Sequence, residues 1–486
     1  MTEKYLPFDG LHEECGVFGI YGSSNEHQTP YDIYYGLFAL QHRGQESCGM
    51  AVNKDGIVSY HRDMGLVNEV FHNEDLDRLP GQMGIGHVRY STTGSSIRDN
   101  SQPLVLRYVK GSLSIAHNGN LTNTAALRRE LERTGAIFQT TSDSEVIAYV
   151  IARERLSCSK VEEAVCKAMK KIEGAYSLLI MSPRKLIAAR DPHGFRPLCI
   201  GRKKDGSYVF ASETCALHAV DAEFIRDVKP GEVVVANENG LTSYDELCGG
   251  KAAHCIFEWI YFARPDSVIE GVGVHESRIE AGRLLARQHP ADADIVIGVP
   301  ESGIDAALGF AYESGIPYSK GFVKNNYIGR TFIKPKQDQR ESAVRIKLHT
   351  LDSNVKGKRV VMLDDSIVRG TTCARIVHML KDAGAKEVHV RISSPPFIWP
   401  CYFGTDIPSR ENLSAVNYTI DEIRQQVGAD SLGYLELDSL KQILCGKNIG
   451  FCDACFTGNY PVAPPQEKSD LEDFIKFSGV PTSNEE

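Results

Sequence analysis

The segment VVMLDDSIVRGTT, residues 360–372, restricts the fold of this chain more than any other stretch. Four apolar residues predict a buried strand, and Asp364 and Asp365 follow at its carboxyl end. A short loop containing glycine then leads to Thr371 or Thr372, either of which can cap a helix. Ligands of open parallel sheets bind at this end of the strands, where backbone N–H groups and a helix N-terminus attract phosphate. The simpler alternative is a strand with an acidic exit turn.

The sequence around this segment predicts an α/β domain. After about residue 265, a helix near 276–289 precedes the apolar strand ADIVIGVP, and a further strand, EVHVRISSP, follows the 360–372 segment. Strands that alternate with helices favour a parallel sheet. The sequence GVPESG, residues 298–303, is another strand end whose loop amides fit a pyrophosphate. Mg²⁺ prefers oxygen ligands and substrate phosphates, so we expect Ser302 near a magnesium ion.

The order of strand, paired acids, hydroxyl-rich loop and helix resembles the phosphoribosylpyrophosphate (PRPP) signature of the type I phosphoribosyltransferases, and GxxxxGK[ST] is absent. The resemblance implies that Asp364 and Asp365 contact ribose hydroxyls or Mg²⁺ and that the loop holds the 5′-phosphate. The expected PRPP-binding residues of this segment are Asp364, Asp365, Ser366, Ile367, Val368, Arg369, Gly370, Thr371 and Thr372. The expected magnesium-binding residues are Ser302, Asp364 and Asp365.

The polar, basic segment VKNNYIGRTF, residues 323–332, is a surface loop on its composition alone. The resemblance implies that it is a lid that closes over the substrate. The family usually has arginine at the position of Asn326, whereas Lys324 and Arg330 retain their positive charge. We therefore expect Lys324 and Arg330 to contact PRPP.

The first half of the chain shows a different pattern of secondary-structure signals. From residue 15 to about 250, short β-type runs alternate with Gly, Asn and Asp turn signals. Helical patterns occur near residues 31–42, 123–134, 143–155 and 161–172. This mixture predicts an α+β domain.

Cys15, in HEECGVFGIYG, is a buried core thiol or a nucleophile. Glu13 and Glu14 would raise its pKa and weaken it as a nucleophile. If residues 1–14 are a propeptide, their removal gives Cys15 a free α-amino group with a pKa of about 8, which can accept the thiol proton. One residue would then supply both nucleophile and base.

Three further motifs resemble the glutamine amidotransferases of the N-terminal-nucleophile class, as does LQHRGQES at 40–47. GHVRYSTTG provides Arg89, which the resemblance assigns to the glutamine α-carboxylate. AHNGNL provides the Asn118 amide and the Gly119 N–H as an oxyanion hole. TSDSE provides Asp143 for the substrate ammonium. The class implies an αββα fold for this domain.

The chain has 13 cysteines, 54 Lys+Arg against 63 Asp+Glu, and a formal charge of -9. This balance offers no electrostatic footprint for nucleic acid, and we find no export signal and no membrane-spanning run, so we expect a cytoplasmic protein. Cytosolic cysteines rarely form disulfide frameworks. GFCDACFTG contains the pair Cys452 and Cys455, and Cys255 and Cys401 also have aromatic neighbours. These four thiolates could hold zinc or an iron–sulfur cluster.

Together the two halves resemble the glutamine PRPP amidotransferase family. The resemblance implies that ammonia released from glutamine at Cys15 displaces pyrophosphate from PRPP, giving 5-phosphoribosylamine, in the first committed step of purine synthesis. One branch of that family has a cleaved propeptide and a structural [4Fe-4S] cluster, which implies Cys255, Cys401, Cys452 and Cys455 as its ligands rather than zinc ligands. Purine nucleotide feedback inhibition and a homotetramer also follow only from the resemblance. The other cysteines are expected to be buried or incidental.

The expected organisation is a propeptide at 1–14, the glutaminase domain at 15–250, the phosphoribosyltransferase domain with the cluster segments at 255–460, and a C-terminal tail at 461–486. Three alternatives remain. Another amidotransferase could share the first half but would lack the 360–372 segment. A sugar-phosphate-sensing regulator would not need Cys15, Arg89, Asn118 and Asp143 together, and a redox protein would need a flavin or nicotinamide fingerprint that is missing.

Overall fold

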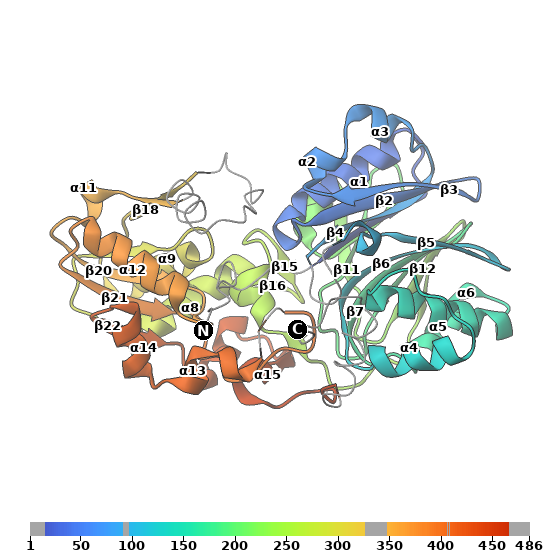
Figure 1. Cartoon of the computed structure of the whole chain (residues 1–486). Helices are drawn as coiled ribbons and strands as arrows, with labels where there is room; N and C mark the ends of the chain where they lie inside the picture. The colour runs from blue at the N-terminus through green and yellow to red at the C-terminus, as the bar shows by residue number, and fades with distance from the viewer. Residues whose placement is uncertain (1–14, 91–96, 326–347, 406, 408, 466–486) are drawn as a thin grey trace, which may run out of the picture.

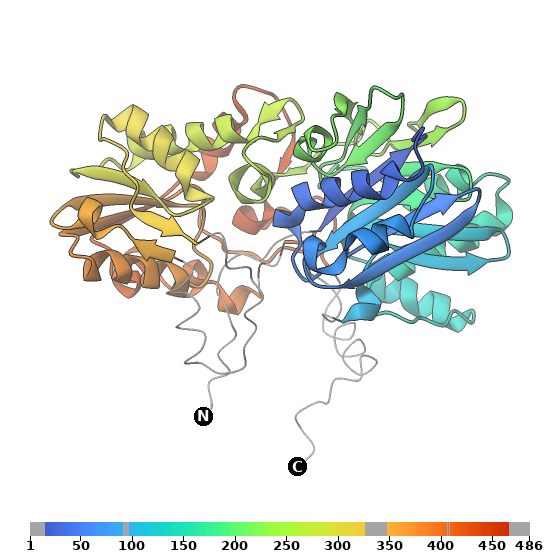
Figure 2. The ribbon, with the colours of Figure 1, turned by 90° about the horizontal axis from the view of Figure 1, so that it is seen from above.

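The computed structural model describes residues 15–90, 97–325, 348–405, 407 and 409–465. The first and second halves of the chain form two lobes that lie side by side (Figures 1 and 2). The predicted propeptide (1–14) and most of the predicted tail, from residue 466, lie outside the described residues, as do Asn326 and Arg330. Among the described helices, none combines the length and apolar character needed to cross a membrane.

Two antiparallel sheets stack in the first lobe. In spatial order, the first sheet consists of β11 (Glu223–Asp227), β9 (Cys199–Arg202), β10 (Tyr208–Ala211), β1 (Gly16–Tyr21), β4 (Met83–Arg89), β2 (Ser47–Lys54) and β3 (Ile57–Met64). The second consists of β13 (Gly240–Tyr244), β12 (Val233–Asn237), β8 (Leu186–Arg190), β7 (Gly174–Met181), β6 (Gly111–Leu121) and β5 (Leu104–Tyr108). Val17, Ile85, Ala116 and Leu179 belong to the apolar layer between the sheets.

Helices cover both outer faces of this pair of sheets. The first sheet is covered by α1 (Gln28–Ala39), α2 (Val67–Val70), α3 (Asn73–Asp77) and α7 (Thr214–His218), and the second by α4 (Thr124–Arg133), α5 (Asp143–Ser157) and α6 (Val161–Met169). Short 3₁₀ turns occur at Gln41–Arg43 and Arg98–Asn100. The predicted αββα arrangement is confirmed.

The second lobe contains the predicted parallel sheet. Its strands lie in the order β17 (Ile295–Gly298), β20 (Arg359–Asp364), β21 (Glu387–Ile392) and β22 (Ser431–Tyr434), all paired in parallel. Helices α8 (Val274–Gln288) and α9 (Gly303–Ser314) contribute to one apolar cluster, and α12 (Thr371–Asp382) and α14 (Ile420–Val427) to another. Because parallel strands end at the same edge, Gly298 and Asp364 bring their following loops together.

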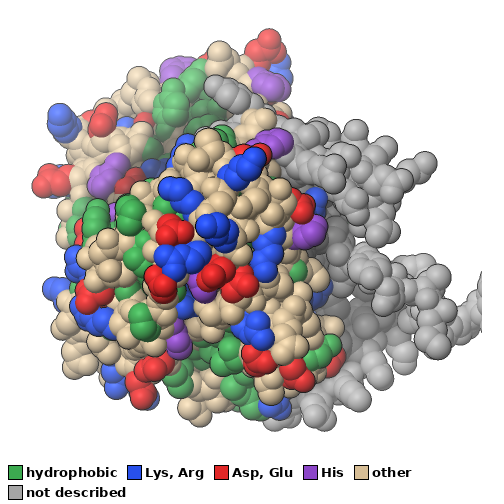
Figure 3. Space-filling model, turned by 90° about the vertical axis from the view of Figure 1, so that its left-hand side faces the viewer, with side chains coloured by type: hydrophobic (Ala, Val, Ile, Leu, Met, Phe, Trp, Pro, Cys, Tyr) green, Lys and Arg blue, Asp and Glu red, His purple; other side chains and the backbone are tan. Residues whose placement is uncertain are grey.

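Shorter elements complete this lobe and join it to the first. They are β14 (His254–Cys255), a π-helical turn (Glu258–Phe262), β15 (Val268–Ile269), β16 (Val272–Gly273), β18 (Phe322–Lys324), β19 (Leu348–Thr350), α11 (Asp352–Val355), 3₁₀ turns at Arg410–Asn412 and Leu437–Leu444, α13 (Ser414–Asn417), β23 (Phe451–Cys452) and α15 (Ala454–Thr457). On the outer face of this lobe, basic and acidic side chains are interspersed (Figure 3). This face therefore lacks the continuous basic surface that a nucleic-acid-binding regulator would use.

Candidate functional site

Cys15 lies directly before β1, in the middle of the first sheet. Because Gly16 pairs with Val88 on β4, Cys15 lies beside the end of that strand. The Cys15 Sγ donates a hydrogen bond to the carbonyl oxygen of Tyr90 at 3.5 Å. The thiol is therefore placed where β4 delivers Arg89, the residue expected to bind the glutamine α-carboxylate.

The Cys15 thiol is a weak acid in this environment. Burial raises its pKa to about 11; the positive charge of Arg89 opposes the shift, and the carboxylates of Asp143 and Glu46 add to it. The strand register places Arg89 beside Cys15, and the Asp143 carboxylate acts on the thiol electrostatically. A thiol with such a pKa needs a nearby base before it can attack a carbonyl carbon.

Asn118 and Gly119 lie next to each other on β6, as the predicted oxyanion hole requires. Asn118 is 1% exposed, and its Nδ2 has no hydrogen-bond partner among the described residues. A buried donor without a partner costs about 1–3 kcal/mol, so this amide favours an acceptor supplied by a ligand. Gly119 has φ +143°, and a Cβ there would lie 2.1 Å from the Ala175 oxygen, so only glycine fits.

Asp143 begins α5 and remains a carboxylate although it is buried. Its Oδ2 accepts a hydrogen bond from the Leu121 N–H at 3.1 Å, and its Oδ1 lies 3.5 Å from His117 Nδ1. Burial would raise the pKa of Asp143, but His117 and the hydrogen bonds from Leu121 and Ser144 together lower it. An ionised, desolvated carboxylate is suited to bind a substrate ammonium group.

Arg43 is a residue of this site that the sequence patterns did not single out, although it lies in LQHRGQES. Its Nε donates to the Cys15 carbonyl oxygen at 3.0 Å. Its Nη1 lies 2.6 Å from Glu213, and its Nη2 lies 2.6 Å from Glu258 in the π-helical turn of the second lobe. The main chain of the candidate nucleophile is therefore tied to the junction between the lobes.

The second candidate site lies at the carboxyl edge of the parallel sheet. Asp364 ends β20, and Gly370, with φ +87°, precedes the first turn of α12. Asp365 is the centre of the hydrogen bonds: it accepts one from Ser302 Oγ at 2.6 Å and another from the hydroxyl of Ser366. The two predicted strand-end loops therefore meet at Asp365, and they bring the expected magnesium-binding residues Ser302, Asp364 and Asp365 together.

The two aspartates of this edge are buried and electrostatically strained. Burial and the neighbouring carboxylate of Asp365 raise the pKa of Asp364 well above its ordinary value. Burial also raises the pKa of Asp365, although hydrogen bonds from Ser302 and Ser366 oppose the shift. Neither aspartate forms an ion pair within the described part of the chain. A cation or a sugar hydroxyl would relieve this strain.

The flanking basic residues are only partly described. Lys324 ends β18, and its Nζ lies 3.5 Å from Glu301, which belongs to the GVPESG loop. This contact brings the first residues of the predicted lid to the pyrophosphate loop. Arg330, together with Asn326 and the rest of the lid from residue 326, lies outside the described residues.

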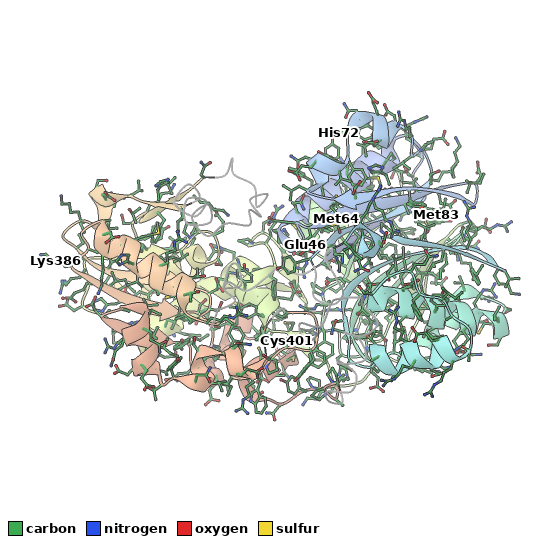
Figure 4. The ribbon with its side chains drawn as sticks, in the orientation of Figure 1. Glu46, Met64, His72, Met83, Lys386 and Cys401 are labelled. Atoms are coloured by element: carbon green, nitrogen blue, oxygen red, sulfur yellow. The ribbon has the colours of Figure 1, made fainter. Side chains whose placement is uncertain are left out.

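The four singled-out cysteines gather at the junction of the lobes. Cys255 and Cys452 face each other on the parallel strands β14 and β23. Burial raises the pKa of Cys455 well above its ordinary value, and Cys401, Cys452 and Cys255 add to the shift. Cys401 is labelled at the junction in Figure 4, as is Glu46 above it. Within the described residues, no group of His, Cys, Asp or Glu is close enough together to hold a metal ion.

Comparison with known proteins places this arrangement in a family. A model of the glutamine amidotransferase domain matches residues 87–219, which include Arg89, Asn118, Gly119 and Asp143. An amidophosphoribosyltransferase of Methanocaldococcus jannaschii is 50% identical over 469 residues, covering 93% of this chain and 99% of the relative.

Two solved structures share the whole fold. One, described as the allosteric regulatory enzyme of purine biosynthesis, has a TM-score of 0.87 and 47% identity, covering 93% of this chain and 97% of its own. The other is the glutamine PRPP amidotransferase from B. subtilis in complex with ADP and GMP, with a TM-score of 0.86, 47% identity, and coverage of 92% and 98%. With this identity over nearly its full length, the chain belongs to the amidophosphoribosyltransferase family.

Proposed function

We propose that this chain carries out the glutamine-dependent amination of PRPP with Cys15 as the nucleophile of the first lobe. The family relationship gives the reaction. The observation that supports its assignment to residues is the position of Cys15 at the end of β4 beside Arg89, where the Asp143 carboxylate also acts on the thiol. Removal of residues 1–14 would leave the α-amino group of Cys15 as the base. The thiolate then attacks the glutamine amide carbon, forming a thioester and releasing ammonia.

The oxyanion of this step would form beside Asn118 and Gly119 on β6. Asn118 Nδ2 and the Gly119 N–H would stabilise the negative oxygen of the tetrahedral intermediate, because they are fixed in a buried strand and need little reorganisation. Arg89 and Asp143 would hold the α-carboxylate and α-ammonium of glutamine. Water then hydrolyses the thioester to glutamate.

The second lobe would bind PRPP at the edge that Asp364 and Asp365 share with Ser302. Mg²⁺ supplies charge neutralisation of the pyrophosphate when it is bound, and these oxygen donors suit a hard cation. The loop from Ser366 to Thr372 would receive the 5′-phosphate through backbone N–H groups and the start of α12. Ammonia then displaces pyrophosphate at the anomeric carbon.

Ammonia transfer needs a shielded route between the sites. Free ammonia is mostly protonated in neutral water and would escape, so exclusion of solvent at the junction would favour coupling. The Arg43–Glu258 ion pair is consistent with a fixed junction. The predicted lid, residues 323–332, remains a prediction; its truncation should uncouple glutamine hydrolysis from phosphoribosylamine formation.

A [4Fe-4S] cluster at Cys255, Cys401, Cys452 and Cys455 is part of this proposal, with a structural role. Each cysteine of a [4Fe-4S] cluster binds a different iron, so the cluster would need all four of these thiolates. Anaerobically purified protein should be brown and contain iron and sulfide in similar amounts. A colourless, zinc-containing protein would contradict this assignment.

We also propose regulation by purine nucleotides. The B. subtilis structure was solved with ADP and GMP. A nucleoside monophosphate carries the same ribose 5-phosphate unit as PRPP, so the 366–372 loop is chemically suited to bind it. A homotetramer, expected from the family resemblance, stays a prediction that sedimentation can test.

The test is glutamate release from glutamine, with and without PRPP and Mg²⁺, combined with N-terminal sequencing of the active protein. Stimulation by PRPP, together with an N-terminal cysteine, would support both sites and the propeptide. If PRPP has no effect and free ammonia is never used, the second lobe is not a transferase, and the sugar-phosphate-sensing regulator becomes the better explanation.

A further inference from the structure

A single buried glutamine joins the two ends of the candidate glutamine site. Gln102 is 3% exposed. Its Oε1 accepts a hydrogen bond from the N–H of His117 at 2.8 Å, and its Nε2 donates to Ser144 Oγ at 3.0 Å. His117 directly precedes the oxyanion-hole residues 118–119 on β6, and Ser144 directly follows Asp143 in α5. Gln102 therefore spans the strand and the helix that carry the two subsites.

The hydrogen-bond directions around Gln102 follow from elementary chemistry. The backbone N–H of His117 can only donate, so the amide oxygen of Gln102 must face it and the amide nitrogen must face Ser144. The Ser144 hydroxyl accepts that bond and keeps its own proton for His117 Nδ1, at 3.1 Å, or for Asp143 Oδ1, at 3.4 Å. The Gln102 side chain thus orients the hydroxyl that helps to fix the Asp143 carboxylate.

A second contact strengthens this bridge. Asn100 exchanges two hydrogen bonds with Thr141: its Nδ2 donates to Thr141 Oγ1 at 2.8 Å, and its Oδ1 accepts from the Thr141 N–H at 3.1 Å. Residues 100–102 therefore hold residues 141–144 at two points. Such double attachment restricts both translation and rotation of the first turn of α5.

We propose that Gln102 is a positioning residue that sets the separation between the Asp143 carboxylate and the oxyanion donors Asn118 and Gly119. This inference rests on the proposed glutamine site. Glutamine would be held at its α-ammonium by Asp143 and at its side-chain amide by the oxyanion hole, so the spacing decides whether the amide carbon meets the thiolate. Loss of Gln102 should impair the reaction of correctly bound glutamine without changing the intrinsic reactivity of Cys15.

The experiment uses the processed protein, which begins at Cys15 once residues 1–14 are removed, as wild type and as Gln102→Met, with two electrophiles that label Cys15. Methionine has a similar length but removes both hydrogen bonds. A diazoketone analogue of glutamine must fill both subsites before it reacts, whereas iodoacetamide needs only the thiol. We expect the labelling rate with the diazoketone to fall about 10- to 100-fold and that with iodoacetamide to stay within about two-fold of wild type, because a small misplacement is costly only for an oriented reactant.

The chain offers a matched control. Gln288 makes the same pair of contacts in the second lobe, where its Oε1 accepts from the Glu436 N–H at 3.2 Å and its Nε2 donates to Ser439 Oγ at 2.6 Å. Gln288→Met should leave both labelling rates unchanged. Equal losses with the two electrophiles in Gln102→Met, or no loss with either, would overturn the positioning role.

Two further measurements distinguish failure of the proposed glutamine site from failure of the positioning role of Gln102. If wild type itself does not react with the diazoketone at Cys15, the proposed glutamine site is wrong, and the inference falls with it. If Gln102→Met does not fold, Ser144→Ala removes the hydroxyl that accepts the bond from Gln102 Nε2, together with its contacts to His117 and Asp143. Ammonia-dependent activity then reports whether the second lobe is intact. In that variant we expect a higher KM for glutamine and a lower kcat, with unchanged ammonia-dependent activity; unchanged glutamine kinetics would contradict the proposal.

Discussion

The environments of the buried carboxylates in the two lobes shift their pKa values in opposite directions. Asp143 in the first lobe is surrounded by His117 and hydrogen-bond donors, and its pKa is lowered although burial opposes this. Asp364 and Asp365 in the second lobe lie beside each other without an ion pair among the described residues, and their pKa values are raised. The charge of Asp143 is therefore compensated by its neighbours, whereas no ion pair with a cationic side chain compensates Asp364 and Asp365 among the described residues.

This difference teaches how each site would recognise its substrate. Glutamine is a small zwitterion, and a rigid pocket with charges fixed in advance binds it with little reorganisation. PRPP brings several negative charges, so under the proposed function the acidic edge would bind it together with Mg²⁺. We therefore expect the glutaminase site to be largely preformed and the transferase site to be completed by its ligands.

The largest loss of activity is expected from replacing the proposed nucleophile of the first lobe. Cys15→Ala should lower glutamine-dependent activity by at least about 10⁴-fold, since removal of a covalent nucleophile is among the costliest changes in an enzyme. Ammonia-dependent pyrophosphate release should remain near the wild-type rate. Cys48→Ala, a buried thiol on the adjacent part of the same sheet, is the control and should keep both activities. Loss of the ammonia reaction in Cys15→Ala would show that the two sites are not separable.

The corresponding test in the second lobe is Asp364→Asn. The neutral amide cannot neutralise a cation, so we expect the rates with both glutamine and ammonia to fall about 10²- to 10³-fold. Basal glutaminase activity without PRPP should remain. Asp382→Asn, at the exposed end of α12, provides a control with the same chemistry. A PRPP-dependent rate equal to that of wild type in Asp364→Asn would show that this carboxylate has no role in the reaction.

A smaller effect is expected at Lys324. Its ammonium group lies against the Glu301 loop and is partly exposed, so solvent weakens its contribution. Lys324→Ala should raise the KM for PRPP about ten-fold with little change in kcat for ammonia, as expected for loss of one phosphate contact. Lys320→Ala, two residues before β18, should behave like wild type. A fall in kcat at constant KM would instead indicate that Lys324 acts in the chemical step.

The smallest expected effects are on thermal stability. Replacing a buried aspartate should change Tm in opposite directions in the two lobes. An Asp has a pKa of about 3.9 when unfolded. The folded pKa of Asp365 is higher, so the folded state binds more protons, and stability falls as the pH rises from about 3.9 through the folded value. The folded pKa of Asp143 is lower, so its contribution is present above about 3.9 and is lost as the pH falls through its folded value.

Near neutral pH and without metal, Asp365→Asn should therefore raise Tm, and Asp143→Asn should lower it. Each shift should be about 2–4 °C, which corresponds to about 1 kcal/mol for a domain of this size. Calorimetry should also show that Mg²⁺ together with PRPP stabilises wild type more than Asp365→Asn. Equal shifts in one direction would mean that the two carboxylate environments are not opposite.

The sequence patterns were most informative where structure is local. The strand, acids, loop and helix of 360–372 occur in the chain as β20 and α12, because apolar periodicity and capping residues act over a few positions. The αββα and parallel-sheet assignments are confirmed for the same reason, supported by the family resemblance. Cys15, Arg89, Asn118 and Asp143 could be singled out because each lies in a short, distinctive motif.

Residues that act between distant segments could not be found in this way. Arg43 binds Glu258 across 215 positions, and Gln102 joins β6 to α5 through hydrogen bonds that no periodicity reveals. Spacing likewise did not predict that Cys255 and Cys401 act together with the Cys452–Cys455 pair. The family resemblance implied it.

By itself, the sequence of this protein determined the two domain types, the motifs of both sites and their order along the chain. Only the tertiary structure decided that Arg43 ties Cys15 to the junction and that Gln102 bridges the two ends of the candidate glutamine site. It also decided that Asp143 is charge-compensated, whereas Asp364 and Asp365 are not. The physical reason is that secondary structure depends on neighbours within a few residues. Charge environment and side-chain partnership, in contrast, depend on which distant segments the packed sheets bring together.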